Sequence, residues 1–300
     1  IRDRLNIMKI KVAVIFGGKS VEHEISIISA VQAMNNMDDG KYEIIPLYLT
    51  KNNEFYYGES LRDINEYRNL NALLKKCQRV ILVNEKYKNF IVKYPMKALR
   101  KNILTDFEVA FPIVHGTNVE DGTLQGYLKT LNIPFVGCGV FASGLGMDKY
   151  AMKIMLKEAG FPVLDCCRFS AHDYLNPEQI MATVEAKFSY PVIVKPVNLG
   201  SSVGISRADD KAGLEKSLAT AFTFADKVLV EPAITELKEI NCAVLGDSDE
   251  AIASECEEPV TAHEILSYKD KYMNDGTKTG GSKGMQSLKR KIPADITEEV

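Results

Sequence analysis

Short apolar runs alternate with helical patterns along the first half of the chain. Residues 10–16 are apolar except for Lys11, which is typical of a strand buried on both faces. Gly17 and Gly18 end this run, and a rough helical stripe of apolar side chains follows. The expected strands are 10–16, 42–49, 79–83, 89–94, 107–114 and 133–136, and the expected helices are 22–35 and 121–131. This alternation predicts a parallel α/β unit that ends near Gly146.

The pattern changes in the second half, where several strands follow one another with no helix between them. Such a succession predicts antiparallel sheets. The expected strands are 161–169, 191–197, 205–207, 227–234, 240–245 and 251–255, and the expected helices are 148–159, 177–188 and 210–224. Residues 268–283 are polar and rich in Gly and Lys, and we expect a mobile loop there. The predicted fold class is therefore α/β, with a parallel N-terminal domain before an α+β domain that has antiparallel sheets.

Composition narrows the class of protein. The 300 residues are 46% hydrophobic and 26% charged, enough for two compact domains. A formal charge of −3 gives no electrostatic footprint for nucleic acid. No apolar run approaches the ~20 residues that cross a bilayer, and no signal peptide is visible, so we expect no membrane partner and a cytoplasmic location. The six cysteines lack C-x-x-C spacing and are interpreted as reduced thiols.

Both ends of the chain look irregular. Residues 1–7 precede Met8 and are interpreted as a leader or a reading-frame scar. Residues 295–300 resemble the opening of a helix, which Thr297 caps and acidic residues follow. We therefore expect a chain cut short at its C-terminus.

The glycine turn at 17–18 is the first candidate for chemistry. It resembles a phosphate-binding P-loop, but that motif requires a glycine at position 13, which is Ala13. A strand, a glycine turn and a helix remain, and the amides of that helix could face a carboxylate or a phosphate. Glu22 and Glu24 at the helix start have a simpler interpretation, in which they complement the helix dipole.

The segment KPVNLGSSVG at 195–204 is a sharper candidate. A Gly/Ser turn between two strands offers consecutive N–H groups to phosphate oxygens, and Lys195 adds a positive charge. The alternative is an ordinary hairpin with a solvated lysine. Glu231 and Glu239 at strand ends could hold ribose hydroxyls or simply face water. His115 follows a buried strand, where α/β sites form. A partial dinucleotide fingerprint at 137–142 comes too late in the chain to support an NAD-binding oxidoreductase.

Taken together, these segments resemble the signatures of D-alanine–D-alanine ligases, a family within the ATP-grasp superfamily. The matching motifs are GGKSVEHEIS at 17–26, HG at 115–116, EDGTLQG at 120–126, MDK at 147–149, VKP at 194–196, GSSVG at 200–204 and KY at 271–272. The resemblance runs from Met8 to the C-terminus. It implies domains over 8–146 and 147–300, the second consisting of subdomains 147–226 and an incomplete 227–300, with ATP between two antiparallel sheets.

The resemblance also implies a reaction and its residues. ATP phosphorylates the carboxylate of one D-alanine, the amine of a second D-alanine attacks, and phosphate leaves, as peptidoglycan synthesis requires. The implied catalytic residues are Glu22, His115, Ser201 and Tyr272. The implied nucleotide-binding residues are Lys149, Lys195, Gly200, Ser202, Glu231, Ile234 and Glu239. The implied metal is Mg²⁺ or Mn²⁺, and the family is usually dimeric through its N-terminal domain.

One departure from the family pattern concerns the metal. The family's metal carboxylates and its intermediate-binding arginine are expected downstream of Val300, so no metal ligand is assigned and the 300-residue chain is expected to be inactive. The alternatives are a D-alanine–D-serine ligase and a catalytically inactive nucleotide-binding fragment. A D-lactate ligase is disfavoured, because depsipeptide-forming relatives tend to carry histidine at the position of Tyr272.

Overall fold

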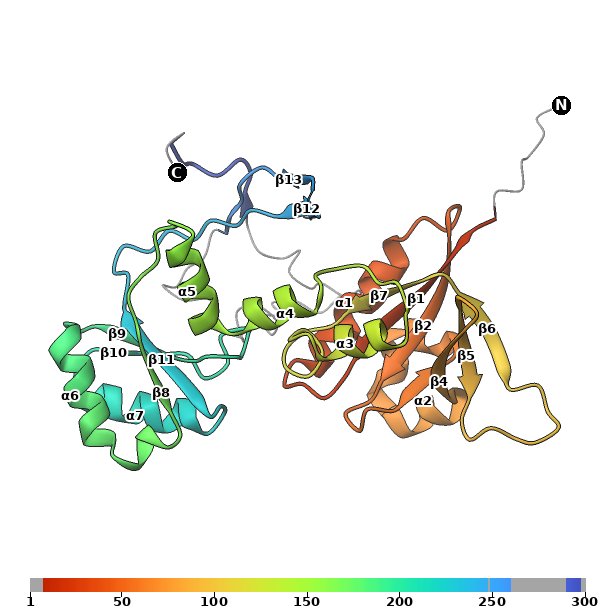
Figure 1. The fold of residues 1–300 in the computed structure, drawn as a ribbon, viewed down its shortest axis with the longest axis horizontal. Helices are drawn as coiled ribbons and strands as arrows, with labels where there is room; N and C mark the ends of the chain where they lie inside the picture. Colours follow the sequence, from red (N-terminus) through yellow and green to blue (C-terminus); the bar gives the residue numbers. More distant parts are fainter. Residues whose placement is uncertain (1–7, 248, 260–289, 298–300) are drawn as a thin grey trace. The chain divides into compact units, whose positions relative to one another are not determined.

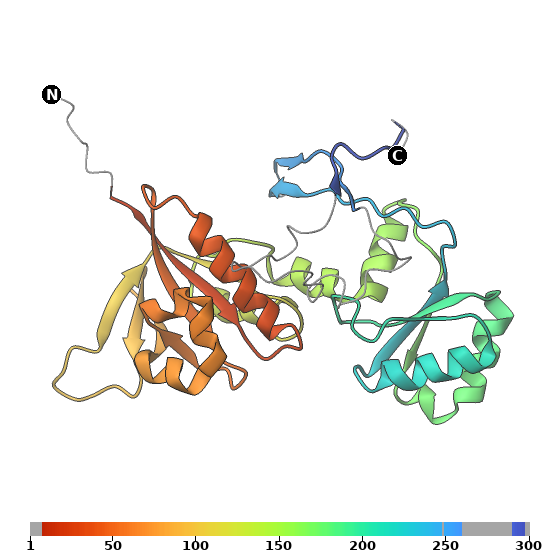
Figure 2. The ribbon, with the colours of Figure 1, turned by 180° about the vertical axis from the view of Figure 1, so that it is seen from behind.

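The computed structural model describes residues 8–247, 249–259 and 290–297. The chain forms two compact units (Figures 1 and 2). Unit 1 consists of Ile1–Val163 with Val197–Gly200, and unit 2 consists of Leu164–Pro196 with Ser201–Val300. Each unit is described by itself.

Unit 1 is built on a seven-stranded sheet in the order β6-β5-β4-β3-β2-β1-β7. The strands are β1 Ile10–Gly17, β2 Tyr42–Leu49, β3 Phe55–Tyr57, β4 Gln78–Glu85, β5 Lys88–Lys93, β6 Ile103–Phe107 and β7 Val109–Ile113. Only β1 pairs in parallel, with β2 and β7; the remaining pairs are antiparallel. The sheet of the predicted parallel α/β domain is therefore mixed, because the expected strands 79–83 and 89–94 form a hairpin within the same sheet, with Lys86 and Tyr87 at its turn. Both turn residues have positive φ, 50° and 64°, the geometry of a two-residue hairpin.

Helices cover both faces of this sheet (Figure 1). The apolar stripe of α1 (His23–Asn36) packs with α2 (Leu70–Lys76) against Val12, Val14 and Phe16 of β1. Ala13 and Ile15 face the other side, where α3 (Thr123–Thr130) lies. The apolar run from Val12 to Phe16 thus follows from burial on both faces, as the sequence predicts. Unit 1 also contains η1 (Glu59–Arg62), η2 (Ile64–Asn69), α4 (Val140–Met147) and α5 (Lys149–Glu158).

Unit 2 contains a four-stranded sheet in the order β10-β9-β11-β8, and every pairing in it is antiparallel, as predicted. The strands are β8 Cys167–Ser170, β9 Val192–Pro196, β10 Ser206–Ala208 and β11 Lys227–Pro232. Val192, Val194, Val228 and Val230 pack against α6 (Pro177–Lys187) and α7 (Lys211–Phe222). The remaining described elements are η3 Asp173–Leu175, β12 Val244–Gly246, β13 Ala251–Ala253, β14 Glu258–Pro259 and β15 Arg290–Lys291.

Several predicted strands are shorter in the structure or absent from it. The segment 133–136 makes only a bridge between Phe135 and Ala110, and Pro134 has no N–H with which to extend that pairing. The strand expected over 107–114 is split, because β6 ends at Phe107 and β7 begins at Val109. The strands expected over 161–169 and 240–245 are reduced to β8 and β12. Strands β3 and β6 and helices α2 and α4 were not predicted, and the loop expected over 268–283 lies outside the described residues.

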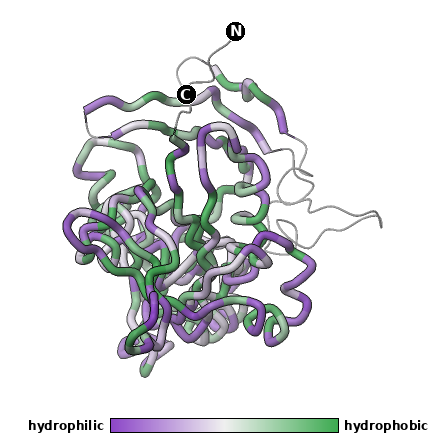
Figure 3. Tube along the Cα trace, turned by 90° about the vertical axis from the view of Figure 1, so that its right-hand side faces the viewer, coloured by the Kyte–Doolittle hydropathy of each residue, from purple (hydrophilic) through white to green (hydrophobic). Residues whose placement is uncertain are grey.

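Hydrophobic and hydrophilic stretches alternate at short intervals along the trace (Figure 3). Within the described part of the chain, no helix has both the length and the apolar character that crossing a bilayer demands.

Candidate active site

The turn between β1 and α1 holds Glu22 in a fixed position. Gly17 and Gly18 have φ of 93° and 94°, a conformation that favours glycine. A Cβ on Gly18 would lie 2.3 Å from Val119 Cγ1, so no larger residue fits there. The Gly18 N–H donates to Leu49 O at 2.7 Å, which ties the turn to the end of β2. Glu22 follows after Lys19, Ser20 and Val21, and it is only 3% exposed.

Two glycines of unit 1 approach the Glu22 carboxylate closely. A Cβ on Gly116, which has φ +86°, would stand 2.6 Å from Glu22 Oε2 and 2.3 Å from Ser20 Oγ. A Cβ on Gly200 would stand 3.3 Å from the same carboxylate oxygen. The Glu22 side chain makes no capping hydrogen bond to α1. A buried carboxylate that lies among backbone segments, without capping its helix, fits ligand recognition better than a dipole role.

Glu24 behaves differently, although it lies only two residues further on. Its carboxylate forms an exposed ion pair with Lys51 at 2.7 Å. Burial raises the pKa of the Glu24 carboxyl, but the hydrogen bond and charge of Lys51 outweigh this and leave the pKa below its ordinary value. Glu24 is therefore a surface residue whose negative charge is stabilised by the ion pair with Lys51.

His23 is a buried residue that the sequence reasoning missed. Its Nδ1 lies 2.6 Å from Gly18 O and its Nε2 lies 2.8 Å from the Tyr48 hydroxyl. Because a carbonyl oxygen only accepts, Nδ1 carries the proton and Nε2 accepts from Tyr48. Burial lowers the pKa of His23, which keeps the ring neutral. His23 thus fixes the glycine turn that carries Glu22, and its place within the 17–26 motif was the available signal.

His115 and Lys149 are both held by hydrogen bonds to distant segments of unit 1. The half-buried His115 ring lies 3.0 Å from the Ser29 hydroxyl of α1 through Nε2. Lys149 is the first residue of α5, and its backbone N–H donates to Val197 O at 3.0 Å. Its ammonium donates to Leu199 O. Lys149 is therefore tied to the segment that leads into Gly200.

Unit 2 brings three predicted nucleotide residues together. Lys195 on β9 forms an ion pair with Glu231 on β11, and the two side chains are 19% and 7% exposed. The register pairs Lys195 with Leu229 and Glu231 with Ile193, so the two charges lie diagonally on one face of the sheet. They line a cavity of about 160 Å³ together with Ile234. This face is opposite the one that α6 and α7 cover.

Of the remaining predicted residues, the structure describes Ser201, Ser202 and Glu239. Ser201 and Ser202 both adopt positive φ, 48° and 60°. They lie in a long connection, because β9 ends at Pro196 and β10 begins only at Ser206, so this is not a tight hairpin. Glu239 is half-buried and is not among the described residues that line the cavity at Lys195. Tyr272 lies outside the described residues.

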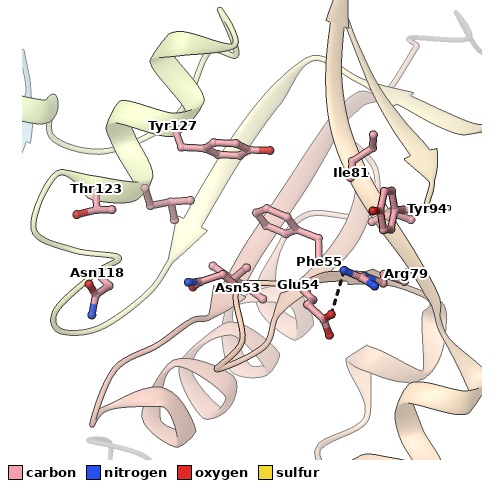
Figure 4. A pocket seen from close by; sticks show the side chains of 12 residues that line it. Asn53, Glu54, Phe55, Arg79, Ile81, Tyr94, Asn118, Thr123 and Tyr127 are labelled. Carbon is pink, nitrogen blue, oxygen red and sulfur yellow. Dashed lines mark ion pairs between the residues drawn. The ribbon is translucent and has the colours of Figure 1, made fainter. Parts of the chain in front are cut away.

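A larger cavity in unit 1, of about 360 Å³, contains none of the predicted residues (Figure 4). Arg79 pairs with Glu54 at 3.0 Å and lies 4.6 Å from the centre of the Tyr94 ring. Phe55 stacks on Tyr127, with ring centres 6.1 Å apart. The smaller cavity is lined by two cations, Lys195 and Arg207, and one carboxylate, Glu231, whereas the larger one is lined by Arg79 and Glu54 alone among charged side chains. The smaller cavity therefore suits a phosphate better, despite its size.

The described residues provide no ligand set for the metal that the resemblance implies. Among the described residues, no group of three or more His, Cys, Asp or Glu side chains is arranged to hold a metal ion. We derive no step through a metal.

Comparison with known families gives the class of this chain. Residues 11–138 match the family model described as D-ala D-ala ligase N-terminus, and residues 155–298 match the one described as D-ala D-ala ligase C-terminus. The chain therefore belongs to the D-alanine–D-alanine ligase family, which consists of ATP-dependent ligases. This confirms the family and the α/β class expected from the motifs.

Individual relatives agree with this membership. The chain is 39% identical over 297 residues to the D-alanine–D-alanine ligase of Caldicellulosiruptor bescii, a match that spans 97% of this chain and 76% of that protein. It is 38% identical over 299 residues to the ligase of the same name from Acetivibrio thermocellus, with the same coverage of both. The chain thus spans about three quarters of the length of these relatives.

Solved structures show the same similarity in three dimensions. The D-alanine–D-alanine ligase of Helicobacter pylori matches with a TM-score of 0.73 and 30% identity, over 84% of this chain and 76% of that one. The VanG D-Ala:D-Ser ligase of Enterococcus faecalis matches with a TM-score of 0.72 and 30% identity, over 97% and 78%.

Proposed function

We propose that this protein joins two D-alanine molecules at the expense of ATP. The γ-phosphoryl group passes to a carboxylate oxygen of the first D-alanine, which gives an acyl phosphate and ADP. The amine of the second D-alanine attacks the acyl carbon, loses a proton, and inorganic phosphate leaves. The product serves peptidoglycan precursor synthesis. The observation that carries this proposal is the buried Lys195–Glu231 pair, which lies in a cavity together with Ile234 in a chain of this family.

The nucleotide is proposed to bind on the face of the unit 2 sheet that α6 and α7 do not cover. In the structure Lys195 is paired with Glu231, so its ammonium is already held at the cavity. A phosphate oxygen would give that ammonium a second negative partner. Main-chain groups of Glu231 and Ile234 would bind the adenine, and Glu239 the ribose hydroxyls. Lys149, Gly200 and Ser202 would contact the phosphates.

The first D-alanine is proposed to bind at Glu22. Its ammonium is a cation, and a carboxylate that is 3% exposed offers it a charge-assisted hydrogen bond with little competition from water. His115, steadied by Ser29, would help to neutralise the acyl phosphate. Ser201 and Tyr272 would join Glu22 in closing the site, which excludes water from an intermediate prone to hydrolysis.

D-Serine is the second candidate for the attacking substrate. The observation that favours it is the similarity to the D-Ala:D-Ser ligase structure, which covers 97% of this chain. Both candidates share the first half-reaction, so they differ only in the amine that attacks.

Several attributes of the proposal rest on the family alone. We expect Mg²⁺ or Mn²⁺ to be required, the cytoplasm of a bacterium to be the location, and a homodimer to be the assembly. The expectation that the 300-residue chain has no turnover by itself remains a prediction from the sequence. Product formation by this chain in the presence of Mg²⁺ tests it, and measurable D-alanyl-D-alanine would contradict it.

Nucleotide and substrate binding test the proposal independently of turnover. We expect ATP to bind with an affinity that GTP does not match, and D-alanine to bind where L-alanine does not, both by calorimetry. Phosphate release with D-alanine, D-serine or D-lactate as the second substrate then distinguishes the candidates. A chain that binds neither ATP nor D-alanine would contradict the proposed function.

A further inference from the structure

Two cysteines face each other across a strand pair in unit 2. Asn241 and Glu257 form an antiparallel bridge in which each N–H donates to the other's carbonyl oxygen at 2.8 Å. In an antiparallel ladder the next pair inward is a non-hydrogen-bonded pair, with Cα atoms about 4.5 Å apart. That next pair is Cys242 and Cys256. The expected separation lies within the ~4.4–6.8 Å that a disulfide spans.

The ladder beyond this pair keeps the two residues opposite each other. It resumes at Val244 and Ala253, after one extra residue on the second strand. The extra residue lies at 254–255, since the Ser254 N–H donates to Ala243 O at 2.8 Å. The irregularity therefore falls after the cysteine pair and leaves its register intact.

The Cys242 side chain also reaches the facing strand. The Cys242 thiol donates to Ser254 O on the facing strand at 3.3 Å. Burial raises the pKa of the Cys256 thiol, and the charge and hydrogen bond of Cys242 raise it further. Cys242 is exposed and Cys256 is half-buried, so an oxidant in solution meets Cys242 first.

We propose that Cys242 and Cys256 are a modification site, in which a glutathione-type disulfide converts the two thiols into one cross-strand disulfide. The Cys242 thiolate attacks one sulfur of glutathione disulfide and releases one glutathione thiolate. The Cys256 thiolate then attacks the Cys242 sulfur and releases the second. The protein loses two electrons and two protons, and glutathione disulfide is reduced to two molecules of glutathione.

The test is disulfide mapping of the whole chain. Reduced protein is treated with glutathione disulfide, the remaining thiols are alkylated under denaturing conditions, and the peptides are analysed by mass spectrometry. We expect two of the six thiols to become unavailable and a peptide to appear that links Cys242 to Cys256. Treatment with dithiothreitol should restore both thiols.

Single variants separate this pair from general thiol reactivity. Cys256→Ser should leave Cys242 as a mixed disulfide with glutathione, and Cys242→Ser should leave Cys256 reduced. Cys138→Ser, which removes an exposed thiol of unit 1, should leave the linked peptide unchanged. A wild-type chain that accumulates the mixed disulfide at Cys242, or links Cys242 to another cysteine, would overturn the proposal. Neither result depends on ligase activity.

Discussion

The two units differ in where their polar candidate site residues lie relative to the sheet. In unit 1 both sheet faces are covered by helices, and β1 has no polar residue from Val12 to Phe16. Its candidate residues, Glu22 and His115, follow the ends of β1 and β7. In unit 2 the helices α6 and α7 cover one face only, and Lys195 and Glu231 stand within strands on the other. A sheet covered on both sides can carry function only at strand ends, whereas a sheet with an open face can carry it along the strands.

This difference has an energetic consequence. A strand-end residue depends on the turn that carries it, so its vulnerable neighbours are glycines such as Gly18 and Gly116. A residue within a strand is placed by the hydrogen bonds between the strands. The substitution that disturbs it most is therefore one that removes its side-chain partner on the adjacent strand. Substitutions that affect placement should therefore act through backbone strain in unit 1 and through an unpaired charge in unit 2.

Removal of the Lys195 charge should have the largest effect. Lys195→Met leaves Glu231 buried without its cation, which we expect to cost about 3–5 kcal/mol of unfolding free energy. ATP affinity should fall roughly 10- to 100-fold, because a hydrogen bond to a charged group is lost. Denaturant unfolding and calorimetry measure the two effects.

Two control variants make this result specific. Lys211→Met removes the lysine of an exposed pair with Glu178 and should change neither quantity appreciably. The double variant with Lys195→Met and Glu231→Gln removes both buried charges and should recover stability without recovering ATP affinity. A double variant that binds ATP normally would show that the pair is only structural.

In unit 1 the corresponding test is Gly116→Ala. The new Cβ would overlap Ser20 Oγ and Glu22 Oε2 at a positive φ, so we expect a loss of about 2–4 kcal/mol in unfolding free energy. Gly126→Ala is the matched control, since nothing lies within 4 Å of its Cβ position within helix α3, and it should be neutral or slightly stabilising. Equal stability of the two variants in thermal unfolding would contradict the close approach to Glu22.

The same contrast explains how much of the structure could be predicted from sequence. The long buried strands were predicted nearly to the residue, β2 (Tyr42–Leu49) among them. Burial on both faces leaves an apolar run, from Ile44 to Leu49 in β2, that is easily recognised. The mixed order of the unit 1 sheet could not be predicted, because β3 and β6 are short and only partly apolar, and their partners are set by tertiary packing.

The candidate site residues could be predicted from residue types and from the order of the motifs. The side chains that each of them contacts could be identified only in the structure. Lys195 and Glu231 are 36 residues apart, and no local pattern shows that they pair. His23 was missed because a histidine between two glutamates at a helix start looks like a surface residue. Its burial follows from contacts with Gly18 O and Tyr48, which lies on a different strand.

Glu22→Gln tests the strand-end site directly. The substitution keeps the shape of the side chain and removes its charge, so D-alanine binding should weaken by about 1.5–3 kcal/mol while ATP binding changes little. Glu24→Gln, at the exposed pair with Lys51, should leave both affinities unchanged. Calorimetry with each ligand measures the effect, and unchanged D-alanine affinity in Glu22→Gln would return this residue to a structural role.

The smallest expected effect is a pH dependence of stability that originates in unit 1. Burial lowers the pKa of His23 below its ordinary 6.5, so the unfolded chain binds a proton more readily than the folded one. Stability should therefore rise with pH through the window below about 6.5 and be lost as pH falls, with a slope of at most about 1.4 kcal/mol per pH unit from this residue. Comparing urea unfolding of the wild type and His23→Gln between pH 5 and 8 isolates this contribution, because the variant should lack it. His172→Gln, at an exposed position of unit 2, should keep the wild-type slope. If His23→Gln also kept that slope, the buried neutral ring that fixes the Gly18 turn would not be the group that titrates.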